Sequence, residues 1–187
     1  TLELDRRQRQ MCIRDRFEIA ITVIMYQMFH TTSPRLALIA MVSRLGMVFV
    51  MGINLLLWIM PYVLLTQPMG LNPTDSQTLA LTCFAAHAYG IFIWQLFFGA
   101  HLLALGGIIL RSRLVPHLLG WGLFVGALGY LIQGLVELTF TDVAALDIAT
   151  IGLLTIVTIS ELGFGLWLLL HGRRSKTTVS NSTPQTV

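Results

Sequence analysis

The chain has 187 residues, of which 55% are hydrophobic and only 11% are charged, with a formal net charge of +3. Soluble domains carry about 25% charged residues, so this composition argues against a soluble globular fold. The positive charge comes from arginines near the ends of apolar segments, a distribution typical of membrane topology signals, and we expect no nucleic-acid binding.

Long apolar segments predict helices that span a lipid bilayer. About 20 helical residues cross the roughly 30 Å hydrocarbon layer, and lipid cannot satisfy open backbone groups. The first segment, 17–29, would span only about 20 Å, which predicts a truncated span. Four full-length segments follow, at 36–60, which we expect Pro61 to end, and at 78–110, 116–138 and 148–171. The prediction is an all-α polytopic transmembrane helix bundle over 17–172, with four full spans plus one truncated span.

Loop charges predict which side of the membrane each connection occupies. Every loop Lys or Arg after Phe17 lies at 30–35, 111–117 or 173–176, whereas the connections around Asp75 and at 142–147 carry none. By the positive-inside rule the first three regions are cytoplasmic. We therefore expect a multi-pass protein of the cell membrane with a cytoplasmic C-terminus and a disordered cytoplasmic tail at 173–187.

Residues 1–16 break this pattern, because the same orientation places their five arginines outside. The run 10–16, QMCIRDR, looks like translated sequencing-adapter read-through. We therefore expect 1–16 to be a non-native or disordered basic segment that has replaced the native start. The alternative is a real basic arm with a different topology for the first helix.

Several short motifs resemble those of a known family. They are the run 94–101 (WQLFFGAH), Leu110-Arg111-Ser112, Pro116 with Leu119-Gly120, Gly129-Tyr130-Leu131, and Glu161 followed by 166–169 (LWLL). Together they resemble the bacterial membrane proteins filed as domain of unknown function 4386, with weaker similarity over 17–65. The resemblance implies about six membrane helices, so the first and part of the second would be missing here. It implies no established reaction, ligand or cofactor.

Three ionisable residues fall near the middle of the predicted spans. Arg44, His101 and Glu161 lie nine, ten and twelve residues from the nearest cytoplasmic arginines, or about 14, 15 and 18 Å above the cytoplasmic edge. Charges at that depth are costly and are usually paired or functional. We predict that Arg44 and Glu161 pair across two helices, with His101 close enough to hydrogen-bond one of them. The alternative is a proton or anion site at this level.

Small residues mark one face of the 116–138 segment. Gly122, Gly126 and Gly129 follow one another at helical spacing, and small residues let neighbouring membrane helices approach closely. We expect this face to pack against another helix, with a flexible pivot for gating as the alternative.

The sequence offers no pattern for a metal or a cofactor. Cys12 and Cys83 have no CxxC or Cys/His spacing. His87 and His101 lie on one face of the 78–110 segment, about four helical turns apart, a spacing also found where one helix ligates two stacked haems. Such a site needs a second helix with histidines at matching depths, and His30, His117 and His171 all lie at cytoplasmic ends. We therefore expect no cofactor.

No nucleophile elbow, phosphate loop or zinc signature occurs in the sequence, so we expect that the protein is not an enzyme. The leading hypothesis is a non-catalytic accessory or sensory component embedded in the lipid bilayer, with an unknown ligand and protein partner. The alternative is a small-solute or proton-coupled carrier that uses the Arg44, His101 and Glu161 level. A water-accessible cavity at that level would favour the carrier, whereas a closed bundle would favour a structural pair.

Overall fold

The computed structural model describes residues 17–67, 70–112, 114–139 and 144–171, and every regular element in these ranges is a helix. A short helix, Phe17–Phe29, comes first. It is followed by α2 (Pro34–Thr66), α3 (Pro73–Arg111), α4 (His117–Leu138) and α5 (Ala144–His171). Within the described ranges four helices are long and apolar enough to cross a membrane. The predicted all-α transmembrane bundle is confirmed, while the predictions for 1–16 and 173–187 lie outside the described residues.

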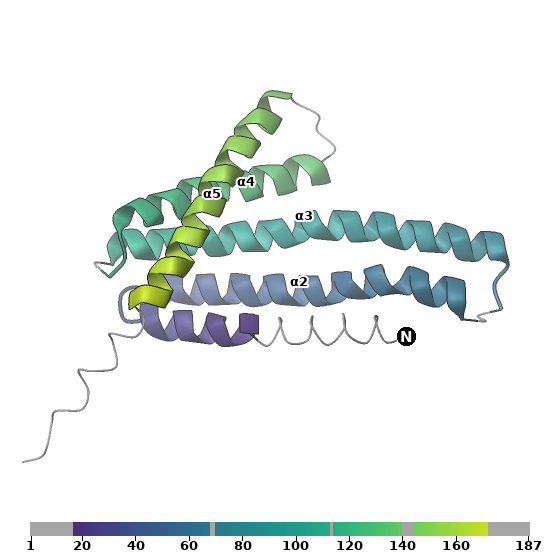
Figure 1. The fold of residues 1–187 in the computed structure, drawn as a ribbon, viewed down its shortest axis with the longest axis horizontal. Coiled ribbons are helices and arrows are strands. Elements are labelled where there is room, and N and C mark those ends of the chain that lie inside the picture. The colour runs from purple at the N-terminus through teal and green to yellow at the C-terminus, as the bar shows by residue number, and fades with distance from the viewer. Residues whose placement is uncertain (1–16, 68–69, 113, 140–143, 172–187) are drawn as a thin grey trace, which may run out of the picture.

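Consecutive helices run antiparallel, and α3 lies between α2 and α4 (Figure 1). The short 17–29 helix lies beside the first half of α2, and α5 packs on α4 and crosses the bundle obliquely. This order follows from the short connections, which place sequential helices next to each other. As a result the beginnings of α2 and α4 and the ends of α3 and α5 share one end of the bundle (Figure 1).

Helix α2 continues through Pro61 to Thr66, so the prediction that Pro61 ends this segment is wrong. Proline lacks an N–H and its ring clashes with the carbonyl four residues earlier, so it destabilises an isolated helix. Here the ring of Pro61 is fully buried in the bundle. Neighbouring helices hold the turn in place, as they commonly do in membrane proteins.

Two other helices begin earlier than the hydropathy pattern predicts, α3 at Pro73 and α5 at Ala144. Proline at the first turn of α3 is compatible with a helix, and the alanines and leucine at 144–146 that begin α5 are strong helix formers. The 33 residues of α2 and 39 residues of α3 correspond to about 50 and 58 Å of helix. Both therefore extend beyond α4 at the end of the bundle opposite the 30–35 connection (Figure 1).

The core lies where the short helix, α2, α3, α4 and α5 meet. Leu123, Ala127 and Val157 are 0% exposed there. The outer faces instead carry large apolar side chains, with Phe49 72% exposed and Leu118 82% exposed. Soluble monomers rarely leave such continuous apolar surface uncovered, so the outer surface is suited to lipid.

Helix α4 uses glycines against both of its neighbours. Gly122, Gly126 and Gly129 lie against α5, and an added Cβ at Gly126 would lie 2.6 Å from Cβ of Val157. On the other side, an added Cβ at Gly134 would lie 3.0 Å from the carbonyl oxygen of Phe92 on α3. The close backbone approach on both sides explains why small residues recur along α4.

Replacing Gly126 by alanine is expected to lower the free energy of unfolding by about 1–2 kcal/mol, because overpacking outweighs the gain in helix propensity. The matched control is Gly152→Ala on α5, where an added Cβ meets nothing within 4 Å. That variant should be as stable as the natural chain or slightly more so. Thermal unfolding of both variants in the same detergent tests this, and equal melting temperatures would contradict the close contact.

Candidate functional site

Arg44 on α2 connects three helices at the centre of the bundle. Its Nη2 donates to Oε2 of Glu18 on the short helix at 2.6 Å. Its Nη1 lies 3.1 Å from Nε2 of His101 on α3. The Arg44 and Glu18 side chains are only 14% and 22% exposed, so this ion pair is largely shielded from the surroundings.

The predicted pair between Arg44 and Glu161 is wrong. Among the described residues the ion-pair partner of Arg44 is Glu18. The reason is the lateral order of the helices, because the short helix lies beside the first half of α2 while α5 packs on α4.

Glu18 was missed although the sequence contains a signal for it. It precedes His30 by twelve residues, which places it about 18 Å from the same edge of the membrane as the other three residues. Counting depth from His30 would have added Glu18 to the predicted level.

His101 joins Arg44 to the α2 backbone. Its Nδ1 lies 2.8 Å from the carbonyl oxygen of Ala40, and the side chain is 2% exposed. Since a carbonyl can only accept, Nδ1 donates, and Nε2 of the neutral ring then accepts from the Arg44 guanidinium. The prediction that His101 hydrogen-bonds one of the charged residues is confirmed, and both of its ring nitrogens are used.

His87 repeats the backbone contact further along the same two helices. Its Nδ1 lies 3.0 Å from the carbonyl oxygen of Asn54. The separation of His87 from His101 along α3 equals the separation of Ala40 from Asn54 along α2. The spacing of His87 and His101 therefore fits two hydrogen bonds across the antiparallel pair of α2 and α3.

A cavity of about 700 Å³ lies beside the ion pair and is lined by all five helices. This volume is within the usual range for small-molecule sites, about 300–1,000 Å³. Its wall includes Glu18, Arg44, His101 and Glu161. Ile21 and Leu169 also line it and are 41% and 77% exposed, so the cavity meets the surface between the short helix and α5.

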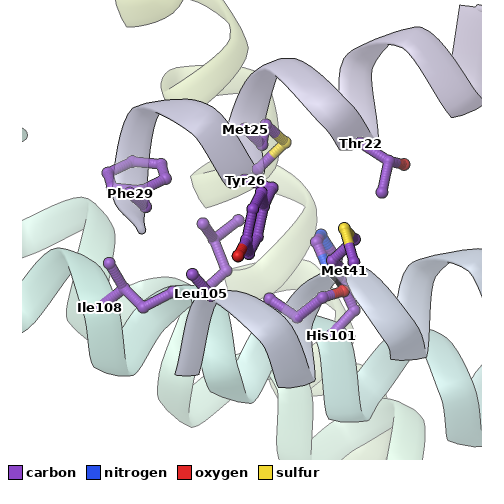
Figure 2. A pocket seen from close by; sticks show the side chains of 10 residues that line it. Thr22, Met25, Tyr26, Phe29, Met41, His101, Leu105 and Ile108 are labelled. Carbon is purple, nitrogen blue, oxygen red and sulfur yellow. Dashed lines mark hydrogen bonds between the residues drawn. The ribbon is translucent and has the colours of Figure 1, made fainter. Parts of the chain in front are cut away.

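A second, much smaller pocket lies where the short helix rests on α2 and α3. Figure 2 shows Thr22, Met25, Tyr26 and Phe29 of the short helix facing Met41 of α2 and His101, Leu105 and Ile108 of α3. Its volume of about 10 Å³ is close to the space that one water molecule needs. It shares Met25, His101 and Leu105 with the larger cavity, so His101 stands between the two spaces.

Three buried polar atoms of residues on the larger cavity have no hydrogen-bond partner among the described residues. They are Oε1 of Glu161, an acceptor, and two donors, Nε1 of Trp94 and Nε of Arg44. Buried polar groups are usually hydrogen-bonded. These three atoms are covered by protein in this conformation, so a bound molecule can supply the partner once the side chain turns toward the cavity.

Aromatic rings form the neighbouring wall. The ring centroids of Trp94 and Phe98 are 5.1 Å apart, and those of Phe98 and Tyr130 are 5.2 Å apart. All three residues line the cavity. The site thus combines unpartnered polar atoms and several ring faces in an otherwise apolar cavity, while the described residues contain no group of three His, Cys, Asp or Glu placed to hold a metal ion.

Comparison with known proteins places the chain in a family. A family model described as "Domain of unknown function (DUF4386)" matches residues 16–172. An uncharacterized protein of the archaeon Archaeoglobus fulgidus is 35% identical over 85 residues, which cover 46% of this chain and 48% of that relative. The match thus spans about half of the relative's length, and no solved structure matches the chain. The chain belongs to the DUF4386 family of membrane proteins.

Proposed function

We propose that this chain is a non-catalytic, multi-pass membrane protein that binds a small solute in the large cavity and carries it across the bilayer in exchange for a proton. The observation that supports this is the cavity of about 700 Å³ at the level of Arg44, His101 and Glu161. A bundle whose ionisable residues only held helices together would be closed around them. The cavity favours a carrier over an accessory or sensory component.

Glu161 is the residue we assign to proton exchange. The charge of Arg44 is balanced by Glu18, and Nε2 of His101 accepts from the Arg44 guanidinium and so carries no proton of its own. Tyr130 of α4 also lines the cavity, but a tyrosine carries no positive charge that could balance a carboxylate. An ionised Glu161 would therefore have no ion-pair partner among the described residues, which is costly in an apolar cavity. A proton removes that cost when the cavity is empty, and a solute can replace the proton when it binds.

Proton exchange can be measured on the full chain in liposomes that contain a pH-sensitive dye. A panel of small amines, carboxylates and sugars is added, and at least one class should drive proton movement that requires protein. Glu161→Gln should abolish this movement, whereas Glu137→Gln, an exposed position on α4, should not. If no class moves protons, the carrier proposal fails, and a solute that binds without moving protons would instead indicate a sensory role.

We also propose that the protein lies in the cell membrane with the 30–35 and 111–117 connections and the C-terminus on the cytoplasmic side. The basic connections lie at the same end of the bundle (Figure 1), as the positive-inside rule requires.

Cysteine labelling of intact cells tests this orientation. In a chain with Cys12 and Cys83 replaced by serine, Asp75→Cys should react with a membrane-impermeant maleimide from outside. Arg111→Cys should react only after permeabilisation. Both positions are exposed, so access to them depends on the side of the membrane. The opposite pattern would overturn the orientation and leave the bundle itself intact.

A further inference from the structure

We propose that the solute is a hydrophobic organic cation, an ammonium group carried on an apolar body, held between the Glu161 carboxylate and the rings of Trp94, Phe98 and Tyr130. This inference rests on the proposed function and assigns the substrate class of the same cavity. Three independent features of the cavity wall support it: its charge, its aromatic surface and the place where it opens.

The charge of the cavity favours a cation. Its ionisable lining includes two carboxylates, one guanidinium and a neutral imidazole. The charge of the guanidinium is already balanced, since Nη2 binds Glu18 while Nη1 binds His101. An anion would gain nothing from Glu161, whereas a cation compensates the charge of its carboxylate.

The unpartnered atom of Glu161 has the right chemistry for an ammonium group. Its Oε1 is buried and accepts no hydrogen bond from the described residues. When the carboxyl group turns toward the cavity, an ammonium N–H can donate to Oε1, forming a charge-assisted bond that is stronger than a bond between neutral groups. Glu18, Arg44 and His101 already bind one another, so Glu161 is the ionisable position where a bound molecule gains most.

The aromatic rings favour the same class of solute. Trp94, Phe98 and Tyr130 form a connected group, with the centroids of Trp94 and Tyr130 6.2 Å apart in an edge-on arrangement. Aromatic faces attract cations, and groups of such rings recognise ammonium ligands. The same rings provide apolar surface for the body of the solute, which a small inorganic cation would leave unused.

The opening of the cavity suits an amphiphilic molecule. Ile21 and Leu169 line it where it meets the surface between the short helix and α5. Both side chains are apolar and face the region that the fold presents to lipid. A solute with an apolar body can enter there from the bilayer.

Charge balance connects binding to proton exchange. The solute enters as an ammonium ion and its N–H donates to Oε1 of Glu161, while the proton that occupied this carboxyl leaves to the aqueous phase. One positive charge replaces another, so the total charge of the site is unchanged. One proton should therefore be released for each cation bound.

Three probes with the same phenylbutyl body separate charge from hydrophobicity: 4-phenylbutylamine, 4-phenylbutyrate and 4-phenylbutanol. Binding to the full chain in phosphatidylcholine nanodiscs is measured by calorimetry in two buffers of different ionisation enthalpy, with empty nanodiscs as the blank. We expect the amine to bind at least about tenfold more tightly than the carboxylate, because only the amine compensates Glu161. The amine should release one proton.

Variants locate the binding site within the cavity. Glu161→Gln should weaken amine binding by about tenfold or more and abolish proton release, and Glu161→Asp should restore part of both. Trp94→Leu should weaken binding of the amine more than binding of the alcohol, since it removes a ring face and keeps an apolar side chain. Glu137→Gln should bind the amine as the natural chain does.

The comparison of probes on the natural chain does not depend on any variant folding. Equal or tighter binding of the carboxylate would overturn the assignment to cations. The carrier proposal would still hold if a different class of solute drives proton movement in the liposome experiment. Amine binding that is unaffected in a folded Glu161→Gln variant would also overturn it. An amine that binds and releases a proton without being transported supports the site and contradicts the carrier.

Discussion

Replacing Arg44 by alanine is expected to lower the free energy of unfolding by about 3–5 kcal/mol, the usual cost of removing one partner from a buried ion pair. The loss leaves the Glu18 carboxylate without its partner at 2.6 Å and takes the donor from Nε2 of His101. The measurement is reversible unfolding of purified chain in mixed micelles. Other partners and water can reduce the cost in membranes, so we expect the loss in free energy of unfolding to lie at the lower end of this range.

A double-mutant cycle identifies the partner of Arg44. Removing Arg44 and Glu18 together should cost less than the sum of the two single changes, because no orphan charge remains. The matched cycle with Arg44 and Glu161 should be close to additive, since the described structure has no ion pair between them. Additivity in the first cycle and coupling in the second would contradict the observed pair and restore the one expected from sequence.

The depth of each ionisable residue could be predicted from sequence because an α-helix has a constant rise per residue. Counting from the basic connections placed Arg44, His101 and Glu161 at one level, and all three line the same cavity. The membrane-spanning segments could be predicted from the length of each apolar stretch, because lipid-facing helices need apolar side chains wherever they contact hydrocarbon.

The lateral partner of each residue could not be predicted in the same way. Depth fixes a position along the membrane normal, but the rotation of each helix and its neighbours depend on packing. Arg44 could therefore be matched with Glu161 by depth, although Glu18 on the adjacent short helix is the residue it reaches. Pro61 is a similar case, because a local rule for ending helices gave way to burial among neighbouring helices.

The cavity was beyond prediction for a different reason. It depends on how five helices fail to fill the space between them, and no sequence pattern records an unfilled volume. Helix α5 takes an oblique course (Figure 1), and Gly165, which has no side chain, lies in the cavity wall on that side. Sequence reasoning could state only what such a cavity would mean if it existed.

Replacing His101 by leucine is expected to lower the free energy of unfolding by about 2–4 kcal/mol, because two polar partners lose a bond at once and one of them is charged. The partners are the carbonyl of Ala40 and the guanidinium of Arg44. His87→Leu is the matched control, since His87 makes the same kind of bond to a carbonyl of α2 without a charged partner. Its loss should be about 1 kcal/mol, measured by unfolding under the same conditions.

Glutamine at position 101 separates support of the fold from proton transfer. Its amide supplies one donor for the carbonyl of Ala40 and one acceptor for Arg44, as the neutral imidazole does. Unlike an imidazole, the amide cannot take up and release a proton. Because both nitrogens of His101 are engaged, we expect His101→Gln to recover most of the stability lost in His101→Leu and to retain proton exchange in liposomes. If the glutamine variant is stable but moves no protons, His101 is itself part of the proton path, and Glu161 alone does not account for the exchange.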